Sequence, residues 1–426
     1  MTATASLPLM PLVADGTTGP ALAEQLRRVE RRKRLRAIAL TLPLLIFLSV
    51  TFLVPLGALL VRAVENPEVA STLGNTVQAL KDWDRKEAPP DAAYAALVTD
   101  FRAIPETAKA GVLARRLNTE IGGARSLIMG SYRALRDDPP ADGLSPAGAR
   151  EKLLSIDPRW SELPYWWAIA KNGSRWTPDY LLASVDLKRN AQGDVVRVGP
   201  QEAAFSVILA RTFSISTMVT LLCILLGYPL AYWLSTLNER KANLMMILVL
   251  LPFWTSVLVR IAAWIVLLQT NGLVNRFLMF TSMADTPVPL LFNRLGVIIA
   301  MVHILLPFMI LPLYSVMKSV PGNYVRAAVS LGSTPLAAFF RVYVPQTYPG
   351  VAAGGLLVFI TSIGYYVTPA LLGGAADQML SYYVAQYTNV DVNWGMACAL
   401  GSVLLATTLI LYAVYRRFAK AELSLG

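Results

Sequence analysis

Few residues of this 426-residue chain are suited to chemistry, and their spacing argues against an enzyme. The only histidine is His303, and one histidine without a second ligand or a nearby acid cannot hold a metal ion. It is either a proton relay or a hydrogen-bonded histidine at a helix interface. The dipeptide Gly-Lys does not occur, which excludes the common phosphate-binding loop and ATP hydrolysis by that route. Cys223 and Cys398 lie in apolar stretches, so a disulfide framework does not organise the fold.

One charged residue, Arg260, lies inside a segment that is otherwise apolar and long enough to cross a membrane. A charged side chain in lipid costs about 2.5 to 3.5 kcal/mol on insertion scales, so Arg260 is expected to face protein or a water-filled interior. There it either bonds backbone carbonyls as a structural residue or lines a path for a solute. No Asp or Glu falls inside any predicted span, which argues against coupling to protons or sodium.

The elements that carry these residues are predicted to be membrane-spanning helices. Hydrophobic residues make up 55% of the chain and charged residues 15%, against about 25% charged residues in soluble proteins. A helix needs about 20 apolar residues to cross the hydrocarbon core, and no segment shows the alternation of a barrel strand. Six segments qualify, with the fifth placed inside the uncharged run 342–376: 37–61, 212–237, 244–268, 295–317, 350–371 and 394–415.

Lysine and arginine are distributed unevenly around these segments, which accounts for the formal net charge of +11. Loops rich in Lys and Arg stay in the cytoplasm. Fifteen of these residues lie on one side, whereas the opposite side has only Arg276 and Arg294 in its short loops. Both termini are therefore predicted to be cytoplasmic. The basic charge needs no nucleic-acid partner, which would require a basic patch with interleaved aromatic residues.

Residues 62–202 contain no uncharged run longer than 12 residues and are predicted to form a water-exposed insert outside the cytoplasm. This insert has 19 basic and 19 acidic residues, so it has no net charge. Apolar residues at three- and four-residue spacing in 91–104 and 107–135 predict amphipathic helices in a small all-α domain. Five of the nine tryptophans lie in the insert, and they either fill its core or form a docking surface.

The loop 318–348, on the cytoplasmic side before the fifth segment, predicts a short helix pair. Gly332 suits a left-handed helix end, and Thr334 with Pro335 suits the start of a second helix. Pro345 and Pro349 are expected to stop that second helix before the membrane. The pair would expose an apolar stripe suited to a groove on another protein, formed by Val325, Ala328, Val329, Leu331, Leu336, Phe339, Phe340 and Val344.

This loop resembles the EAA loop in the permease subunits of bacterial ABC importers. The pattern there is Glu-Ala-Ala, three residues, Gly, and a helix ended by proline, and Ala327, Ala328, Gly332 and Pro345 fall on it. Arg326 takes the glutamate position, which is a charge reversal. The stretches LPFWTSVLVRIAAWIVLLQTNGLVN, ITSIGYYVTPALLGG and LLGYPLAYWLS are similar to spans of spermidine/putrescine permeases. The resemblance covers the first span and the residues from about 203 onward, and leaves the insert unmatched.

The resemblance implies an all-α membrane protein with six transmembrane helices, in which a type I ABC importer permease core follows the first helix. The implied division is a basic cytoplasmic tail (1–36), a first transmembrane helix (37–61), the extracytoplasmic insert (62–202) and the permease core (203–426). The loop 318–348 would couple this core to an ATPase. The coupling residues that the resemblance implies are Arg326, Ala327, Ala328, Gly332, Phe339, Phe340 and Pro345.

The resemblance also implies partners. These are a second homologous permease subunit, two ATPase subunits and a periplasmic substrate-binding protein, assembled in the bacterial inner membrane and without nucleic acid. This chain would perform no catalysis and hold no cofactor, because ATP and Mg²⁺ would be bound by the ATPase subunits.

The cargo implied by the resemblance is a polyamine or a similar nitrogenous solute. A dication that passes spans without acids must rely on aromatic faces and carbonyl groups. The candidates are Trp254, Arg260, Trp264, Tyr365 and Tyr366, although each aromatic residue has packing or an interfacial position as its alternative role. Two other classes stay open: a stand-alone secondary transporter or channel without ATPase partners, and a membrane-anchored sensor or scaffold whose insert is the functional part.

Overall fold

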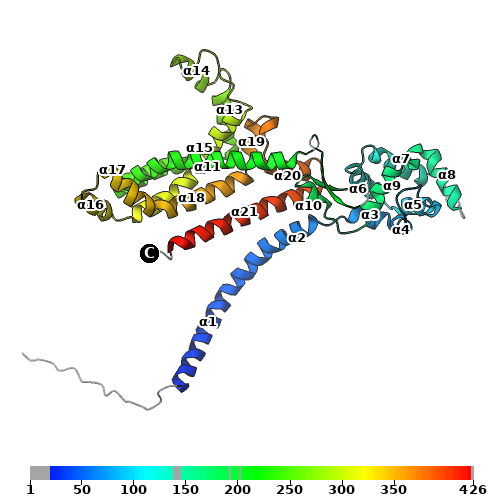
Figure 1. The fold of residues 1–426 in the computed structure, drawn as a ribbon, viewed down its shortest axis with the longest axis horizontal. Helices are drawn as coiled ribbons and strands as arrows, with labels where there is room; N and C mark the ends of the chain where they lie inside the picture. Colours follow the sequence, from blue (N-terminus) through cyan, green and yellow to red (C-terminus); the bar gives the residue numbers. More distant parts are fainter. Residues whose placement is uncertain (1–19, 138–144, 191–192, 200, 202, 424–426) are drawn as a thin grey trace, which may run out of the picture. The chain divides into compact units, whose positions relative to one another are not determined.

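The computed structural model describes residues 20–137, 145–190, 193–199, 201 and 203–423, and most of them are helical (Figure 1). Residues 1–19 of the predicted basic tail lie outside this range, as do short parts of the insert. The chain forms two compact units, 1–58 and 59–426. In the first unit a long helix begins as α1 (Pro20–Leu48), passes through a π-helical turn (Ser49–Leu53) and continues as α2 (Val54–Arg62).

The insert is a helical domain with one small β-hairpin. Its buried core contains Trp160 and Trp166, whose rings contact each other, and Trp166 also contacts Tyr94, so the core interpretation is confirmed for these two tryptophans. Trp176 is 53% exposed, and a docking surface there stays a prediction. The elements are α3 (Pro67–Thr72), α4 (Gly74–Ala79), α5 (Asp91–Ala103), α6 (Thr107–Asn118), α7 (Ala124–Arg136), α8 (Pro146–Ile156), a 3₁₀ turn (Pro158–Ser161), α9 (Leu163–Lys171), α10 (Asp179–Ala183), β1 (Leu187–Arg189) and β2 (Val195–Arg197).

The hairpin corrects the expectation of a wholly helical insert. β1 and β2 pair antiparallel, with Lys188 opposite Val196. Strands of three residues are too short to show the alternating pattern by which a strand is recognised in a sequence.

The remaining elements form the membrane core. They are α11 (Phe205–Thr236), α12 (Glu239–Leu250), a 3₁₀ turn (Leu251–Trp254), α13 (Val257–Leu268), α14 (Leu273–Phe280), α15 (Arg294–Ser319), α16 (Asn323–Ser330), α17 (Pro335–Ala338), a π-helical turn (Phe339–Tyr343), α18 (Val344–Gly364), α19 (Val367–Leu372), a 3₁₀ turn (Ala375–Asp377), α20 (Leu380–Asn389) and α21 (Trp394–Leu423).

Within the described residues, six helical segments are long and apolar enough to cross a membrane, as the sequence predicts. The third is not the predicted 244–268 but Val257–Phe280. α12 ends in the 3₁₀ turn that contains Pro252, and the chain is extended at Thr255 and Ser256 before α13 begins. Proline has no amide hydrogen to donate to the preceding turn, so the helix breaks there.

The fifth span also differs from its prediction, 350–371, because the helical segment runs from Pro335 to Gly364. Pro345 and Pro349 do not stop it. Pro345 lies in the first turn of α18, where a missing amide hydrogen is tolerated, and the preceding π turn supplies wider hydrogen bonding. The helix instead ends at Tyr365, whose backbone is extended, and α19 is a separate short helix.

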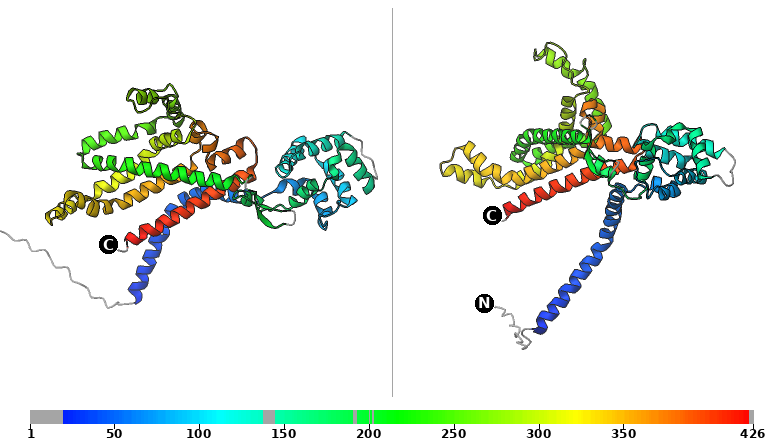
Figure 2. Two further views of the ribbon diagram at one scale, coloured as in Figure 1. Left: turned by 45° about the horizontal axis from the view of Figure 1, so that its top comes forward. Right: turned by 45° about the vertical axis from the view of Figure 1, so that its right-hand side comes forward.

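Three long helices, α11, α15 and α18, pack side by side and form the centre of the membrane core (Figure 2). Glycines allow this close approach. A Cβ added at Gly227 of α11 would lie 2.9 Å from Cγ of Met309, and one added at Gly354 of α18 would lie 2.8 Å from its Sδ. α16 and α17 lie at one end of this bundle, and α10 and α20 lie at the other.

The insert is fixed to that second end by specific contacts. The carboxylate of Asp186 accepts hydrogen bonds from the backbone amides of Ala204, Phe205 and Ser206, at distances of 3.1, 3.0 and 2.7 Å, and so caps α11. The buried ring of Tyr180 lies against Gly395, where an added Cβ would be 2.3 Å from the ring. The junction between insert and core is therefore packed and hydrogen-bonded.

Replacing Asp186 with alanine is expected to reduce stability at pH 7 by about 1 to 2 kcal/mol, because three amides lose their acceptor. Burial raises the pKa of Asp186, but the hydrogen bonds from Ser206, Phe205 and Ala204 outweigh it and hold the pKa below its ordinary value. The cap is therefore fully present above about pH 4 and is lost as the pH falls through the lowered pKa.

The measurement is the apparent melting temperature of the detergent-purified wild type and alanine variant at pH 7 and pH 3. Asp186→Asn keeps an acceptor without the charge and is the matched control. A difference between wild type and alanine variant that is the same at both pH values would contradict the charged cap.

Candidate functional site

The loop between α15 and α18 has the local structure that its sequence predicts. α16 ends at Ser330, and Gly332, two residues later, has a left-handed φ of +94°. The Ser333 amide donates a hydrogen bond to the Ala328 carbonyl oxygen at 3.1 Å. Thr334 begins α17 by accepting a hydrogen bond from the Ala337 amide at 3.3 Å, and Pro335 follows at the first helical position. Glycine is suited to position 332 because any other side chain would be strained at this positive φ.

Among the exposed apolar side chains at this end of the bundle, three are at least 60% exposed, and we call them the apolar foot. Leu331 is 89% exposed, Leu336 70% and Phe340 60%. Large apolar residues exposed together mark contact surfaces. Ala327 and Arg326 are also exposed. Among the described residues the Arg326 guanidinium donates only to Asn323 of the same helix, so its charge stays available.

Phe339 does not belong to this exposed surface, although the sequence predicts it there. Its ring lies 5.1 Å from that of Tyr232 in α11 and stacks on that of Tyr343 at 5.5 Å. Nearby, the Tyr228 hydroxyl and Thr347 Oγ1 share a hydrogen bond of 2.9 Å between α11 and α18. The foot is thus anchored to the bundle, and Pro345 lies inside the continuous helix that leads from it.

A second group of predicted residues lies on α13 and around the end of α18. The indole of Trp264 donates a hydrogen bond to His303 Nδ1 at 3.2 Å, which makes His303 a hydrogen-bonded histidine between α13 and α15. Arg260 lies within electrostatic range of both His303 and Tyr365. Arg260 therefore lies near both Tyr365 and the hydrogen-bonded pair of Trp264 and His303.

Two of the predicted path residues lie apart from this group. Trp254 is 73% exposed on the 3₁₀ turn before α13, and Tyr366 is 44% exposed after α18. Among the described residues, neither shares a ring contact or side-chain hydrogen bond with the group around His303.

Several buried polar atoms near the path candidates have no hydrogen-bond partner within the described chain. They include Arg260 Nε, Tyr365 Oη, and the hydroxyls of Ser216, Ser362 and Thr368. A buried polar group without a partner costs about 1 to 3 kcal/mol, so these atoms are suited to a second molecule. Ser216, Ser362 and Thr368 are not among the site residues predicted from the sequence, although hydroxyl residues inside apolar spans can be recognised there as possible hydrogen-bonding positions.

Residues 213–422 match the protein family described as "Binding-protein-dependent transport system inner membrane component". The insert lies outside the matched residues. Among the relatives is the spermidine/putrescine transport system permease protein PotB of Escherichia coli (strain K12), which is 35% identical over 49% of this chain and 76% of the relative.

Two further relatives have the same description. The PotB protein of Haemophilus influenzae is 36% identical over 50% of this chain and 74% of its own, and that of Salmonella typhimurium (strain LT2) is 34% identical over 49% and 73%. These alignments extend over more than two thirds of each relative. The chain therefore belongs to the binding-protein-dependent inner membrane component family, and it is a multi-pass permease subunit of an ABC importer in the inner membrane.

Proposed function

We propose that this chain forms half of a translocation path and that its apolar foot docks on an ATPase subunit. A second homologous permease would complete the path, two ATPase subunits would bind the feet, and a periplasmic binding protein would deliver the cargo. The observation that carries this proposal is the exposed foot: Leu336 and Phe340 lie on a helical segment that continues unbroken into α18, and Leu331 lies just before that segment. A movement of the foot would reach the membrane core through that helix.

The foot would lie in the cytoplasm, together with both termini. Lys318, Arg326 and Arg341 occur at the foot end of the bundle, whereas the loop between α20 and α21 carries Asp391 and no basic residue. Basic loops are retained in the cytoplasm. ATP and Mg²⁺ would be bound by the ATPase subunits, and this chain would contribute movement without catalysis.

The proposed cargo is a polyamine, which is the solute named in the descriptions of the relatives. Aromatic faces attract cations by about 0.5 to 2 kcal/mol each; Trp264 is hydrogen-bonded to His303, and Tyr365 lies near Arg260. Arg260 in the same group would repel a dication. Weak attraction of the dication by the aromatic faces, opposed by repulsion from Arg260, would keep the time that a polyamine spends at this site short, as transport through the path requires.

The test is ATP-driven uptake of radiolabelled spermidine into vesicles that contain the complete importer. Tyr365→Ala and Trp264→Ala are each expected to reduce uptake about 2- to 30-fold, which corresponds to the loss of one cation–π contact. Tyr365→Phe keeps the ring and is expected to retain most activity. Unchanged uptake in both alanine variants would refute the path assignment.

The same vesicles separate this proposal from a stand-alone secondary transporter or channel. Vesicles with this chain alone, or with the complete importer but no ATP, are expected to take up no spermidine. Uptake by the chain alone without nucleotide would replace the importer proposal with the secondary transporter.

A further inference from the structure

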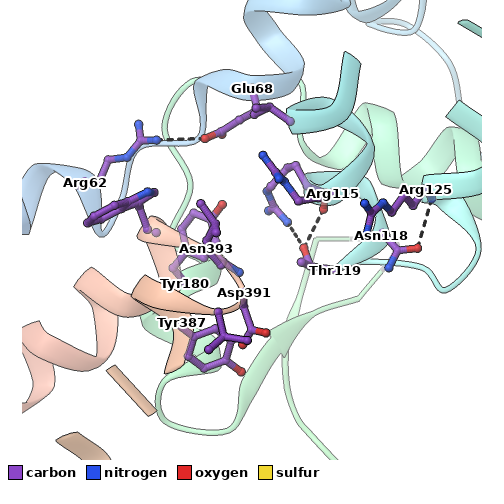
Figure 3. Close-up of a pocket in the computed structure, with 16 residues that line it drawn as sticks. Arg62, Glu68, Arg115, Asn118, Thr119, Arg125, Tyr180, Tyr387, Asp391 and Asn393 are labelled. Atoms are coloured by element: carbon purple, nitrogen blue, oxygen red, sulfur yellow. Dashed lines mark hydrogen bonds and ion pairs between the residues drawn. The ribbon is translucent and has the colours of Figure 1, made fainter. Parts of the chain in front are cut away.

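A cavity of about 730 Å³ opens where the insert meets the loop between α20 and α21 (Figure 3). We call it the junction cavity. Residues from α6 and α10 of the insert form one wall, and Val390 to Gly395 form the other. It lies at the end of the bundle opposite the apolar foot. Its volume is in the range of specific binding sites. The cavity could not be predicted from the sequence, because the residues of its two walls are more than 200 positions apart in the chain.

The charge of this cavity is positive even when its acidic residues are counted, because four arginines line it, Arg62, Arg115, Arg116 and Arg125, against two acidic residues, Glu68 and Asp391. Arg62 pairs with Glu68 at 3.1 Å, and the buried Arg116 pairs with Glu120 at 3.1 Å, so these two guanidiniums serve the fold. Arg115 and Arg125 line the same cavity, are exposed, and form no ion pair among the described residues. They are therefore available to carboxylates of a partner.

The opposite wall supplies apolar surface. Val390 is 66% exposed, Val392 45% and Trp394 49%, and all three line the cavity. Val392 has a φ of +51°, a left-handed conformation that is strained for a β-branched residue. Strained residues of this kind are concentrated at sites that hold another molecule. Exposed tryptophan beside arginine is also the composition found at the centre of protein interfaces.

Both walls are held in place before any partner arrives. Tyr180 lines the cavity and packs against Gly395 at the start of α21, and Asp186 joins the insert to the start of α11. A preformed site avoids part of the entropy cost of binding.

We propose that the junction cavity receives a protruding acidic loop of the soluble binding protein. Carboxylates of that loop pair with Arg115 and Arg125, and an apolar neighbour packs on Val390 and Trp394. This inference rests on the proposed importer function. The guanidiniums repel a free polyamine, so the cavity is suited to the carrier rather than to the cargo. The insert would thus act as a second contact surface for the carrier beside the permease core.

The test uses the complete importer in lipid nanodiscs and the purified binding protein of the same transport system. Surface plasmon resonance is expected to show at least a tenfold weaker affinity for the double variant Arg115→Glu and Arg125→Glu. The wild-type affinity is expected to fall with rising salt, and this slope is expected to flatten in the variant. Val390→Asp changes one exposed side chain, carries little risk for folding, and is expected to weaken binding too.

The matched control is Lys81→Glu with Lys109→Glu, which makes the same charge change on exposed insert residues outside the cavity. This control is expected to bind as the wild type does. Equal weakening in the control, or wild-type affinity in both cavity variants, would overturn the docking proposal. So would binding of free glutamate to the wild-type complex at this cavity, because that result would identify a small-anion site.

Failure of this inference can be distinguished from failure of the importer function. If ATPase subunits copurify with the wild type and uptake needs ATP, the importer function stands whatever the cavity variants show. If they do not copurify, the importer function itself is wrong, and with it the carrier that this inference assigns to the cavity.

Discussion

Replacing Leu331 and Leu336 with aspartate is expected to release the ATPase subunits from the complex and to abolish ATP-driven uptake. These side chains are 89% and 70% exposed, so the change removes no packing inside the chain. Burial of one leucine contributes about 1.5 to 3 kcal/mol, so loss of both weakens ATPase binding by about 10²- to 10⁴-fold. The measurement is a pull-down from detergent, followed by spermidine uptake in vesicles.

A second variant tests the shape of the foot rather than its polarity. Gly332→Val places a β-branched side chain at a φ of +94°, and Ala328→Trp adds bulk to the adjacent helix. Both changes together are expected to give the same loss of ATPase subunits. Val185→Asp with Val195→Asp alters two exposed insert residues and is the control. Retention of the ATPase by both foot variants would refute the docking role.

Replacing Gly354 with leucine is expected to give the largest loss of stability. The first added carbon would lie 2.8 Å from Met309 Sδ and 3.1 Å from the Met309 carbonyl oxygen, and the backbone atom cannot move aside easily. Overpacking of this kind costs about 3 kcal/mol, which corresponds to a fall of about 3 to 4 °C in the melting temperature of a chain of 426 residues. The measurement is thermal unfolding of the purified chain in detergent.

Gly364→Leu is the control for this prediction, because it lies on the same helix and an added Cβ there meets no atom within 4 Å. Its melting temperature is expected to lie within about 1 °C of that of the wild type. Equal melting temperatures for the two variants would show that the close approach of α15 and α18 does not depend on Gly354.

The number of spans could be predicted because it depends on composition alone, which is preserved in any arrangement of the helices. The predicted boundaries of the third and fifth spans were wrong near prolines. Pro252 breaks a helix, whereas Pro345 and Pro349 are accommodated in one, and the difference lies in the turn around each residue. A π turn such as Phe339–Tyr343 leaves no composition signal, so the fifth span was placed too late.

At the candidate site, too, some features could be predicted from the sequence and others could not. Gly332 and Thr334 were predicted correctly as helix end and helix start, because capping depends on neighbouring residues. The different exposure of Phe339 and Phe340 depends on Tyr232, which is more than 100 residues away in the chain. The bond from Trp264 to His303 likewise depends on how α13 and α15 pack. Contacts of this kind require the tertiary structure.

The π turn between α17 and α18 has a consequence for the direction in which the foot faces. Such a turn holds one residue more than the α-helical turn it replaces. Deleting one residue from Phe339–Tyr343 would restore regular winding and leave Leu336 on nearly the same side of the helix axis, whereas deleting one residue from a regular turn of α18 would rotate Leu336 by about 100°. The wide turn therefore adds a residue between the foot and the membrane core and keeps the direction in which the foot faces.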